Sequence, residues 1–264
     1  MFKLVEKDKI KYYIPTTIAD TGLVRVGFST REGGVSEGCY SSMNLRWNCD
    51  DSHENVLENF KRITSAIGID YRDTVHSKQV HEDVVMRVGA KDKGNGITRE
   101  NAYESADALI TDEKGVAIAT SFADCTPVFF IDPAKEVIAL AHSGWRGTVK
   151  RISVRVVERM ISDYGSKAED IIVAIGPSIQ QECFEVGDEV AEIFIKEFGE
   201  ETTQKINGRF HVSMQRAIKK QLEEIGVINI DDCGICTYCN SELLFSHRKT
   251  NGRRGNMCAF MQLI

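Results

Sequence analysis

The sequence predicts an α+β fold in a single domain that spans residues 1–264. Three observations lead to this prediction. The length is sufficient for a large core yet remains near the upper size of one domain. Strand-like segments follow one another in runs, whereas amphipathic helices occur in separate blocks. No internal repeat or low-complexity linker divides the chain.

The first elements along the chain are a strand, a glycine-containing turn and a helix. Val24–Thr30 has the apolar character of a strand and leads into the turn REGGVSEG. A helix is expected after Asp51 or Ser52, either of which can cap free backbone N–H groups, and Gly68 ends it. Its buried face carries Val56, Phe60, Ile63 and Ile67.

The middle of the chain predicts a polar surface loop at Lys91–Ser105, followed by four strands. The strand-like runs are DALIT, GVAIATSFA, TPVFFID and EVIALAH. Two further helices are predicted. One begins near Val149 with Ile152, Val156, Met160 and Ile161 on its apolar face; the other carries Met214, Ala217, Ile218, Leu222 and Ile225 and stops at Gly226.

Composition favours a protein that acts on small molecules. The net charge is −6, and no long run of lysine or arginine indicates a surface for nucleic acid or anionic membranes. No apolar stretch approaches the roughly 18 residues needed to span a bilayer, and the N-terminus lacks the features of a secretory signal. We therefore expect a cytoplasmic protein whose eight cysteines are reduced thiols, metal ligands or catalytic groups.

One hairpin places a thiol near an imidazole. If its turn centres on Pro133 and Ala134, Cys125 lies opposite His142, close enough to share an ion or a hydrogen bond. Both faces of the hairpin are apolar, which predicts a sheet covered on both sides. The alternative is that Cys125 is a small core residue, as buried cysteines usually are, and that His142 begins a turn.

The segment after His142, SGWRGT, favours an anion site. Its glycines precede the expected helix, so free N–H groups and the positive end of the helix dipole would lie beside the thiol and imidazole. We assign Arg146 to anion binding there. The alternatives are a solvated surface arginine and, for Trp145, a core aromatic residue.

Seven motifs lie along the chain: FSTREGGVSEGCYSSMNL, KQVH, ADALIT, ADCTPV, AHSGWRGT, GPSIQQECFEVG and CTYCNSELLFSHRK. Together they resemble those of the YfiH/YlmD family, which is also described as laccase-domain or multi-copper polyphenol oxidase proteins. The resemblance extends from about Phe28 to the C-terminus. Two positions depart from the family pattern: Cys39 replaces a usual proline and Asn256 a common arginine, for which Arg253 or Arg254 could substitute.

The resemblance implies an α/β/β/α sandwich with mixed sheets and a zinc ion bound by His81, Cys125 and His142. It also implies phosphorolysis of adenosine, inosine or methylthioadenosine and deamination of adenosine, so the expected partners are purine nucleosides and phosphate. Two imidazoles and one thiolate leave a fourth tetrahedral position open, as in catalytic zinc sites. His76 is the alternative histidine; the motif position favours His81.

The remaining polar residues of the motifs receive narrower assignments. We assign Arg31, Asn44 and Ser143 to substrate binding, with turn chemistry as the alternative for the first two. The H-x-E motif of zinc nucleobase deaminases is absent, so a deaminase would need another acid or base, for which Asp124 is the first candidate. Its alternative role is to orient a turn or a ligand imidazole.

Three cysteines with C-x2-C-x2-C spacing lie near the C-terminus. Cys233, Cys236 and Cys239 could form a second metal or iron–sulfur site, for which Cys258 would have to supply the fourth ligand. The family pattern instead favours a metal-free loop, and Cys183 is expected to be an inert, half-buried thiol.

Two other function classes remain open besides the zinc enzyme. Copper could occupy a His2Cys set, although six histidines are too few for a multicopper oxidase. A metal-free cysteine hydrolase would use Cys125 as nucleophile and His142 as base, including a proposed role in editing cell-wall precursors. The sequence does not specify the oligomeric state or the preferred nucleoside.

Overall fold

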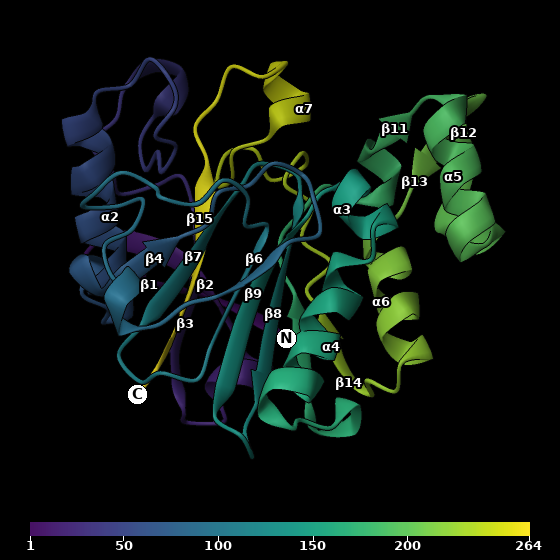
Figure 1. Cartoon of the computed structure of the whole chain (residues 1–264). Coiled ribbons are helices and arrows are strands. Elements are labelled where there is room, and N and C mark those ends of the chain that lie inside the picture. Colours follow the sequence, from purple (N-terminus) through teal and green to yellow (C-terminus); the bar gives the residue numbers. More distant parts are fainter.

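Two six-stranded mixed sheets packed face to face form the centre of the molecule in the computed structural model, which describes residues 1–264 (Figure 1). The first sheet, in spatial order, consists of β1 (Phe2–Lys7), β2 (Ile10–Pro15), β3 (Val24–Ser29), β15 (Met257–Leu263), β7 (Ala117–Phe122) and β4 (Thr74–His76). The second consists of β14 (Asn229–Asp232), β10 (Ile172–Ile175), β8 (Thr126–Asp132), β9 (Val137–Ser143), β6 (Ala108–Thr111) and β5 (Val85–Arg87).

Helices cover the outer face of each sheet. Helix α2 (His53–Ile67) packs on the first sheet, while α4 (Ile152–Tyr164) and α6 (Met214–Glu224) share an apolar core with the second. Beside α6, α5 (Asp188–Phe198) packs on a small third sheet, seen at the right of Figure 1, of strands β11 (Glu185–Val186), β13 (Arg209–Val212) and β12 (Thr203–Ile206). The predicted single-domain α/β/β/α sandwich is thus confirmed. The short helices are α1 (Thr16–Ala19), α3 (Trp145–Val149) and α7 (His247–Thr250).

The ends of α2 follow the sequence prediction. The Ser52 side chain accepts a hydrogen bond from the Asn55 N–H at 3.1 Å, and Gly68 closes the helix in the left-handed region with φ 93°. Helix α6 also lies where its apolar spacing predicted it. None of the helices has the length and apolar character that crossing a membrane requires.

The helix predicted from Val149 is interrupted. Arg151 adopts φ 61° and separates α3 from α4, and Ile161 points to solvent with 43% exposure, so its assignment to the buried face was wrong. The interruption is stabilised by the buried Gln221 of α6, whose side-chain amide donates to the Thr148 carbonyl at 2.9 Å. The Thr148 carbonyl therefore accepts a tertiary hydrogen bond in addition to the one from the Arg151 N–H at 3.0 Å.

The predicted register of the β8–β9 hairpin was wrong by two residues. Pro127, not Cys125, faces His142, because the connection from Asp132 to Val137 contains four residues instead of two. The Asp132 carboxylate accepts the N–H groups of the following turn, at 2.9 and 3.1 Å, and Glu136 adopts φ 51°. A shift of two preserves the faces of a strand, so the predicted apolar faces are correct.

Candidate metal centre and active site

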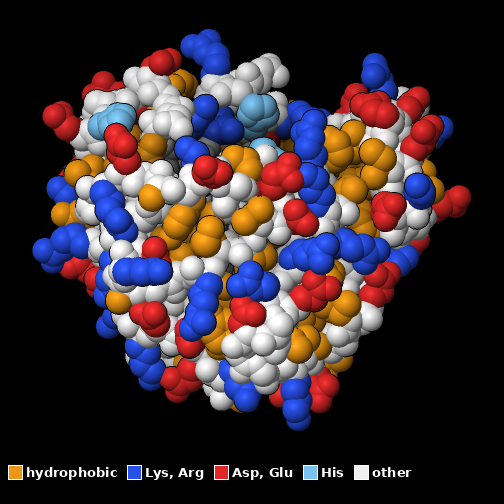
Figure 2. Space-filling model, in the orientation of Figure 1, with side chains coloured by type: hydrophobic (Ala, Val, Ile, Leu, Met, Phe, Trp, Pro, Cys, Tyr) orange, Lys and Arg blue, Asp and Glu red, His pale blue; other side chains and the backbone are white.

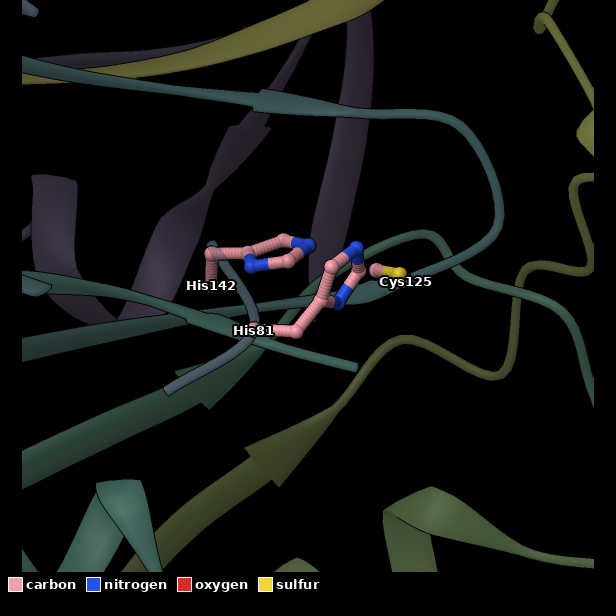
Figure 3. Close-up of side chains that lie close together, drawn as sticks. All are labelled: His81, Cys125 and His142. Atoms are coloured by element: carbon pink, nitrogen blue, oxygen red, sulfur yellow. The ribbon is translucent and has the colours of Figure 1, made fainter. Parts of the chain in front are cut away.

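Three side chains converge at one rim of the sandwich. The possible ligand atoms of His81, Cys125 and His142 all lie within 4.8 Å of one another, and the two imidazole rings are 4.9 Å apart between centroids. Figure 3 shows the two rings side by side, with the cysteine sulfur next to them. They come from the β4–β5 loop, the β7–β8 turn and the end of β9, respectively.

A buried carboxylate holds the loop that carries His81. Asp107 accepts hydrogen bonds from the backbone N–H groups of Val80, His81 and Glu82 at 3.0, 3.1 and 3.0 Å. His81 itself has φ 64°, a left-handed conformation that non-glycine residues adopt rarely. The three hydrogen bonds provide part of the stabilisation that this conformation requires.

The same carboxylate orients the second histidine. Asp107 Oδ1 lies 2.9 Å from His142 Nδ1, and both side chains are buried. This contact assigns Nδ1 to Asp107 and leaves His142 Nε2 for a ligand. Sequence reasoning did not single out Asp107, although one acidic residue at the start of the apolar run ALIT was an available signal.

The charges around this pair shift both pKa values. Burial opposes ionisation of Asp107, but hydrogen bonds from His142 and from the Val80 and Glu82 N–H groups lower its pKa overall. Burial also lowers the pKa of His142, yet the charge of a Cys125 thiolate and the Asp107 carboxylate outweigh it and raise the pKa to about 9. Without a metal, His142 is therefore protonated at neutral pH.

The residues present fit a metal ion. Two imidazoles and a thiolate form a nitrogen- and sulfur-containing ligand set of the kind that zinc and copper accept. Burial, followed by the charge of His142, lowers the pKa of His81, which favours its neutral, metal-binding form. His76, the alternative histidine, lies outside this group; burial lowers its pKa to about 4, and its Nε2 is 2.9 Å from the Ser121 hydroxyl.

The close packing of these ligands requires glycine at position 144. A Cβ atom there would lie 2.9 Å from His81 Nδ1 and 3.1 Å from Cys125 Sγ. Both distances are shorter than ordinary van der Waals contacts. Gly144 thus leaves the space that the His81 and Cys125 side chains occupy, and it also forms the N-cap of α3.

Two cavities meet at His81 and Cys125, and His142 lines the larger one. The larger has a volume of about 970 Å³ and a mostly polar lining that includes Lys78, Gln79 and Asn101. The smaller, of about 290 Å³, is bordered by Trp145 and Phe184, among other apolar residues. His81, Ala123, Cys125 and Arg254 border both cavities. Figure 2 shows histidine and basic side chains gathered at this upper edge of the molecule.

The loop predicted at Lys91–Ser105 forms part of the larger cavity. Residues 96–101 line it, and the Asn101 side chain donates to the carbonyls of His76 and Ser77, both at 3.0 Å. Within the loop, the side chains of Asn95 and Ile97 are buried. This surface loop therefore packs back onto the β4 edge and shapes the cavity.

Arg254 is a cationic residue common to both cavities. Burial lowers its pKa, and its guanidinium contacts the Asn256 side chain and, at 3.3 Å, His247 Nδ1. The sequence named it only as a substitute for the arginine missing at position 256. Arg253, the other substitute, is exposed and lines neither cavity.

The structure places the sequence-assigned Asp124 and Arg146 in different surroundings. Asp124 is buried at the edge of the smaller cavity, where it accepts hydrogen bonds from the Thr237 hydroxyl at 2.6 Å and the Arg248 N–H at 2.7 Å. Arg146 is exposed and stacks on Trp145, 4.3 Å from the ring centroid. Helix α3, which follows Gly144, has only five residues, so its dipole is weaker than the sequence suggested.

The three residues assigned to substrate binding line neither cavity. The Arg31 guanidinium donates to the carbonyls of Ser41 and Ser241 and stacks on a phenylalanine ring. Asn44 is buried and accepts the Arg46 N–H at 2.9 Å, and the Ser143 hydroxyl is buried against Thr148 Oγ1 at 2.8 Å. In this structure all three hold loops and turns in place.

Comparison with known proteins agrees with this architecture. The family model described as multi-copper polyphenol oxidoreductase laccase matches residues 25–264. The chain therefore belongs to the YfiH/YlmD family. The crystal structure of the Bacillus licheniformis hypothetical protein YfiH superposes with a TM-score of 0.91 at 30% identity, covering 100% of this chain and 99% of that one.

Relatives in the YfiH/YlmD family carry the names of nucleoside enzymes. Purine nucleoside phosphorylase YlmD of Bacillus subtilis strain 168 is 32% identical over 244 residues, which is 90% of this chain and 88% of that protein. Adenosine deaminase RL5, from an unknown prokaryotic organism, is 35% identical over 230 residues, which is 84% of this chain and 87% of that protein. The family resemblance inferred from the motifs is confirmed.

The raised pKa of His142 predicts a pH-dependent zinc affinity. Because the imidazolium must lose its proton before it can bind a metal, apparent affinity should rise about tenfold per pH unit up to its pKa of about 9. In Asp107→Asn the pKa of His142 should fall, so the apparent zinc affinity should stop increasing at a lower pH than in the wild type. The maximal zinc affinity should also drop about 10–100-fold, because the imidazole loses its orienting partner. Competition with a chromophoric chelator measures both; a pH-independent wild-type affinity would contradict the assignment.

We expect a substitution of Gly144 to weaken metal binding without unfolding the protein. In Gly144→Ala the new methyl group should displace His81 and Cys125, and zinc affinity should fall about tenfold or more. Gly147→Ala is the matched control, since the atoms nearest to a new Cβ there lie at 3.5 Å or more. Metal content and circular dichroism of both variants provide the measurement, and a Gly144→Ala protein with unchanged zinc affinity would refute the steric argument.

Proposed function

We propose that this protein is a zinc-dependent purine nucleoside enzyme that phosphorolyses adenosine, inosine or methylthioadenosine and deaminates adenosine. The observation that carries the proposal is the convergence of His81, Cys125 and His142 where two cavities meet. His81 and Cys125 border both the polar and the apolar cavity, and His142 borders the polar one. The names of relatives, purine nucleoside phosphorylase and adenosine deaminase, support the substrate class. When bound, zinc with three protein ligands supplies Lewis-acid charge and one open coordination position.

The two cavities suit the two ends of a nucleoside. We place the purine in the smaller cavity, where Trp145 and Phe184 offer aromatic surface and Asp124 a carboxylate. The ribose and phosphate then occupy the larger cavity, whose lining includes Lys78, Arg46 and Arg254. In this arrangement the glycosidic bond lies near the junction.

Arg254 is our leading candidate for phosphate binding. It is half-buried and borders both cavities together with Cys125, and a guanidinium partly withdrawn from water interacts more strongly with an oxyanion than a fully exposed one. Arg146, the residue assigned from sequence, remains a second candidate. After burial and the charge of His142, its charge contributes to the lowered pKa of His81. Its exposure and its stacking on Trp145 favour a weaker contribution.

The two reactions differ in their nucleophile. In phosphorolysis a phosphate oxygen forms a bond to the ribose anomeric carbon while the bond to the purine nitrogen breaks. In deamination water adds to carbon 6 of adenine and ammonia leaves. We propose Asp124 as the proton-transfer group on the purine side; one of its two hydrogen bonds, to Thr237 or Arg248, would have to open for this role.

A cysteine hydrolase is the second candidate function. The observation in its favour is the order Cys125, His142, Asp107, in which a buried carboxylate orients the imidazole beside a thiol. His81 has no place in that arrangement. A copper oxidase would use the same three ligands as the zinc enzyme, and bound copper would give the intense visible absorption of a copper–thiolate bond.

Two ligand substitutions distinguish the zinc enzyme from the hydrolase. Cys125→Ala and His81→Ala should each lose the zinc of this site together with both nucleoside activities. Removing one sulfur atom should cost only about 1 kcal/mol of packing, so the protein should stay folded apart from any stability due to zinc. Zinc analysis, nucleoside turnover and a thermal melt provide the test. A folded, zinc-free and active Cys125→Ala protein would end the zinc proposal, and an active His81→Ala with inactive Cys125→Ala would favour the hydrolase.

Substitution of Arg254 tests the phosphate assignment. Arg254→Ala should raise the KM for phosphate about tenfold to hundredfold, because a charged hydrogen bond is lost, while deamination should change less. Arg146→Ala should have a smaller effect. Arg253→Ala is the control, since this neighbouring arginine is exposed and lines neither cavity. Equal losses of phosphorolysis and deamination in Arg254→Ala would instead assign this residue to the purine site or the fold.

A further inference from the structure

Three cysteines outside the proposed active site form a second cluster. The sulfur atoms of Cys183, Cys236 and Cys239 all lie within 4.8 Å of one another, and those of Cys183 and Cys239 are 3.4 Å apart. Cys183 ends a short 3-10 turn before β11, whereas the other two belong to the turn that follows β14. Two segments more than 50 residues apart in the sequence therefore bring three thiols to one point.

This cluster differs from the one that the sequence spacing suggested. Cys233 is outside the group, and its sulfur instead accepts the Ile235 N–H at 3.3 Å. Cys258, considered as a fourth ligand, is buried in β15 with its sulfur 3.1 Å from the Ser121 hydroxyl. Cys183, which we expected to be inert, takes the place of Cys233.

We propose that Cys183, Cys236 and Cys239 form a second metal site that binds Zn²⁺ through three thiolates. Zinc–sulfur bonds of about 2.3 Å place tetrahedral sulfur ligands about 3.8 Å apart, which falls between the 3.4 Å contact and the 4.8 Å limit of this cluster. Cys236 and Cys239 also have the C-x2-C spacing of zinc ligands. A disulfide would use only two of the three sulfurs.

The surroundings of the cluster suit a bound zinc thiolate. Each cysteine gives up its S–H proton to solvent when the metal binds, so three thiolates and Zn²⁺ carry a net charge of −1. The Gln180 N–H donates to the Cys236 sulfur at 3.5 Å, a hydrogen bond that favours the thiolate. The aromatic residues next to Cys183 and Cys239 in the sequence each carry a stacked cation: Arg248 lies on Phe184 and Lys249 on Tyr238, at 5.4 and 4.5 Å from the ring centroids.

The exposure of the three thiols gives the metal a route into the site. Cys236 is buried, Cys183 is partly exposed and Cys239 is exposed. The buried thiol anchors the site in the protein, while the exposed one lies within reach of solvent and leaves the fourth tetrahedral position to water. The site is thus accessible to added metal and to chelators.

A metal here would join two segments that border the smaller cavity. Phe184, which follows Cys183, lines that cavity. Thr237 lies between the other two ligands and donates to Asp124 at 2.6 Å, directly before Cys125. The metal would act as a clamp on this wall, and its binding does not depend on the function proposed for the first site.

The test measures zinc stoichiometry in the full-length chain purified anaerobically with a reductant. The wild type should hold two equivalents and His81→Ala one, because only the first site is removed. In the His81→Ala background, Cys239→Ser and Cys183→Ser should each lose most of the remaining zinc, whereas Cys233→Ser, the matched control in the same sequence run, should retain it. The exposed Cys239 makes a serine there compatible with folding, which a thermal melt checks.

Cobalt supplies a second readout that does not rely on activity. Co²⁺ added to the metal-free His81→Ala protein should give the strong near-ultraviolet thiolate-to-cobalt absorption, which Cys239→Ser should abolish and Cys233→Ser should keep. A His81→Ala protein with no metal and freely titrating thiols would overturn the proposal. So would a mass loss of two hydrogens that identifies a Cys183–Cys239 disulfide in place of the metal. If the site at His81 binds no zinc but the cysteine cluster does, only the proposed function is contradicted and the second metal site stands.

Discussion

The buried carboxylate of Asp107 is the interaction on which the candidate site depends. It accepts three backbone N–H groups from the loop that carries His81 and also contacts the imidazole of His142. One fully buried side chain thus fixes two of the three candidate ligands. A buried carboxylate is costly unless its charge is compensated, and here four hydrogen-bond donors provide the compensation that lowers its pKa.

The sandwich explains why the ligands meet at its rim. Between the sheets, side chains such as Phe122 and Phe129 fill the space and leave no room for substrate. At the strand ends the β7–β8 turn, the end of β9 and the β4–β5 loop come together, so polar groups are possible without breaking sheet hydrogen bonds. Loops from both sheets then close the two cavities around them.

Local signals in the sequence predicted the elements well, and tertiary contacts account for what they missed. The caps of α2 at Ser52 and Gly68 and the apolar faces of the hairpin are properties of short segments. The hairpin register depended on the turn conformation at Glu136, and the break at Arg151 on a hydrogen bond from α6. The ligand set came from the family motifs, whereas the positions of Asp107 and Arg254 required the folded chain. The spacing of the cysteines likewise predicted a cluster with Cys233, whereas the structure has Cys183 in its place. The sequence could not indicate this, because the cluster forms where two turns distant in the sequence meet.

His81 and Cys125 border two unlike cavities, and this position bears on how one site could serve two reactions. Under the proposed function, the purine rests in the smaller cavity in both cases, so recognition of the base need not change. The outcome then depends on where the nucleophile lies: phosphate in the larger cavity reaches the anomeric carbon, whereas deamination requires water at carbon 6 of the purine in the smaller cavity. Arg254 borders both spaces. Selection between the reactions would follow phosphate concentration, since the protein groups that orient the metal ligands, Asp107 and Gly144, are common to both.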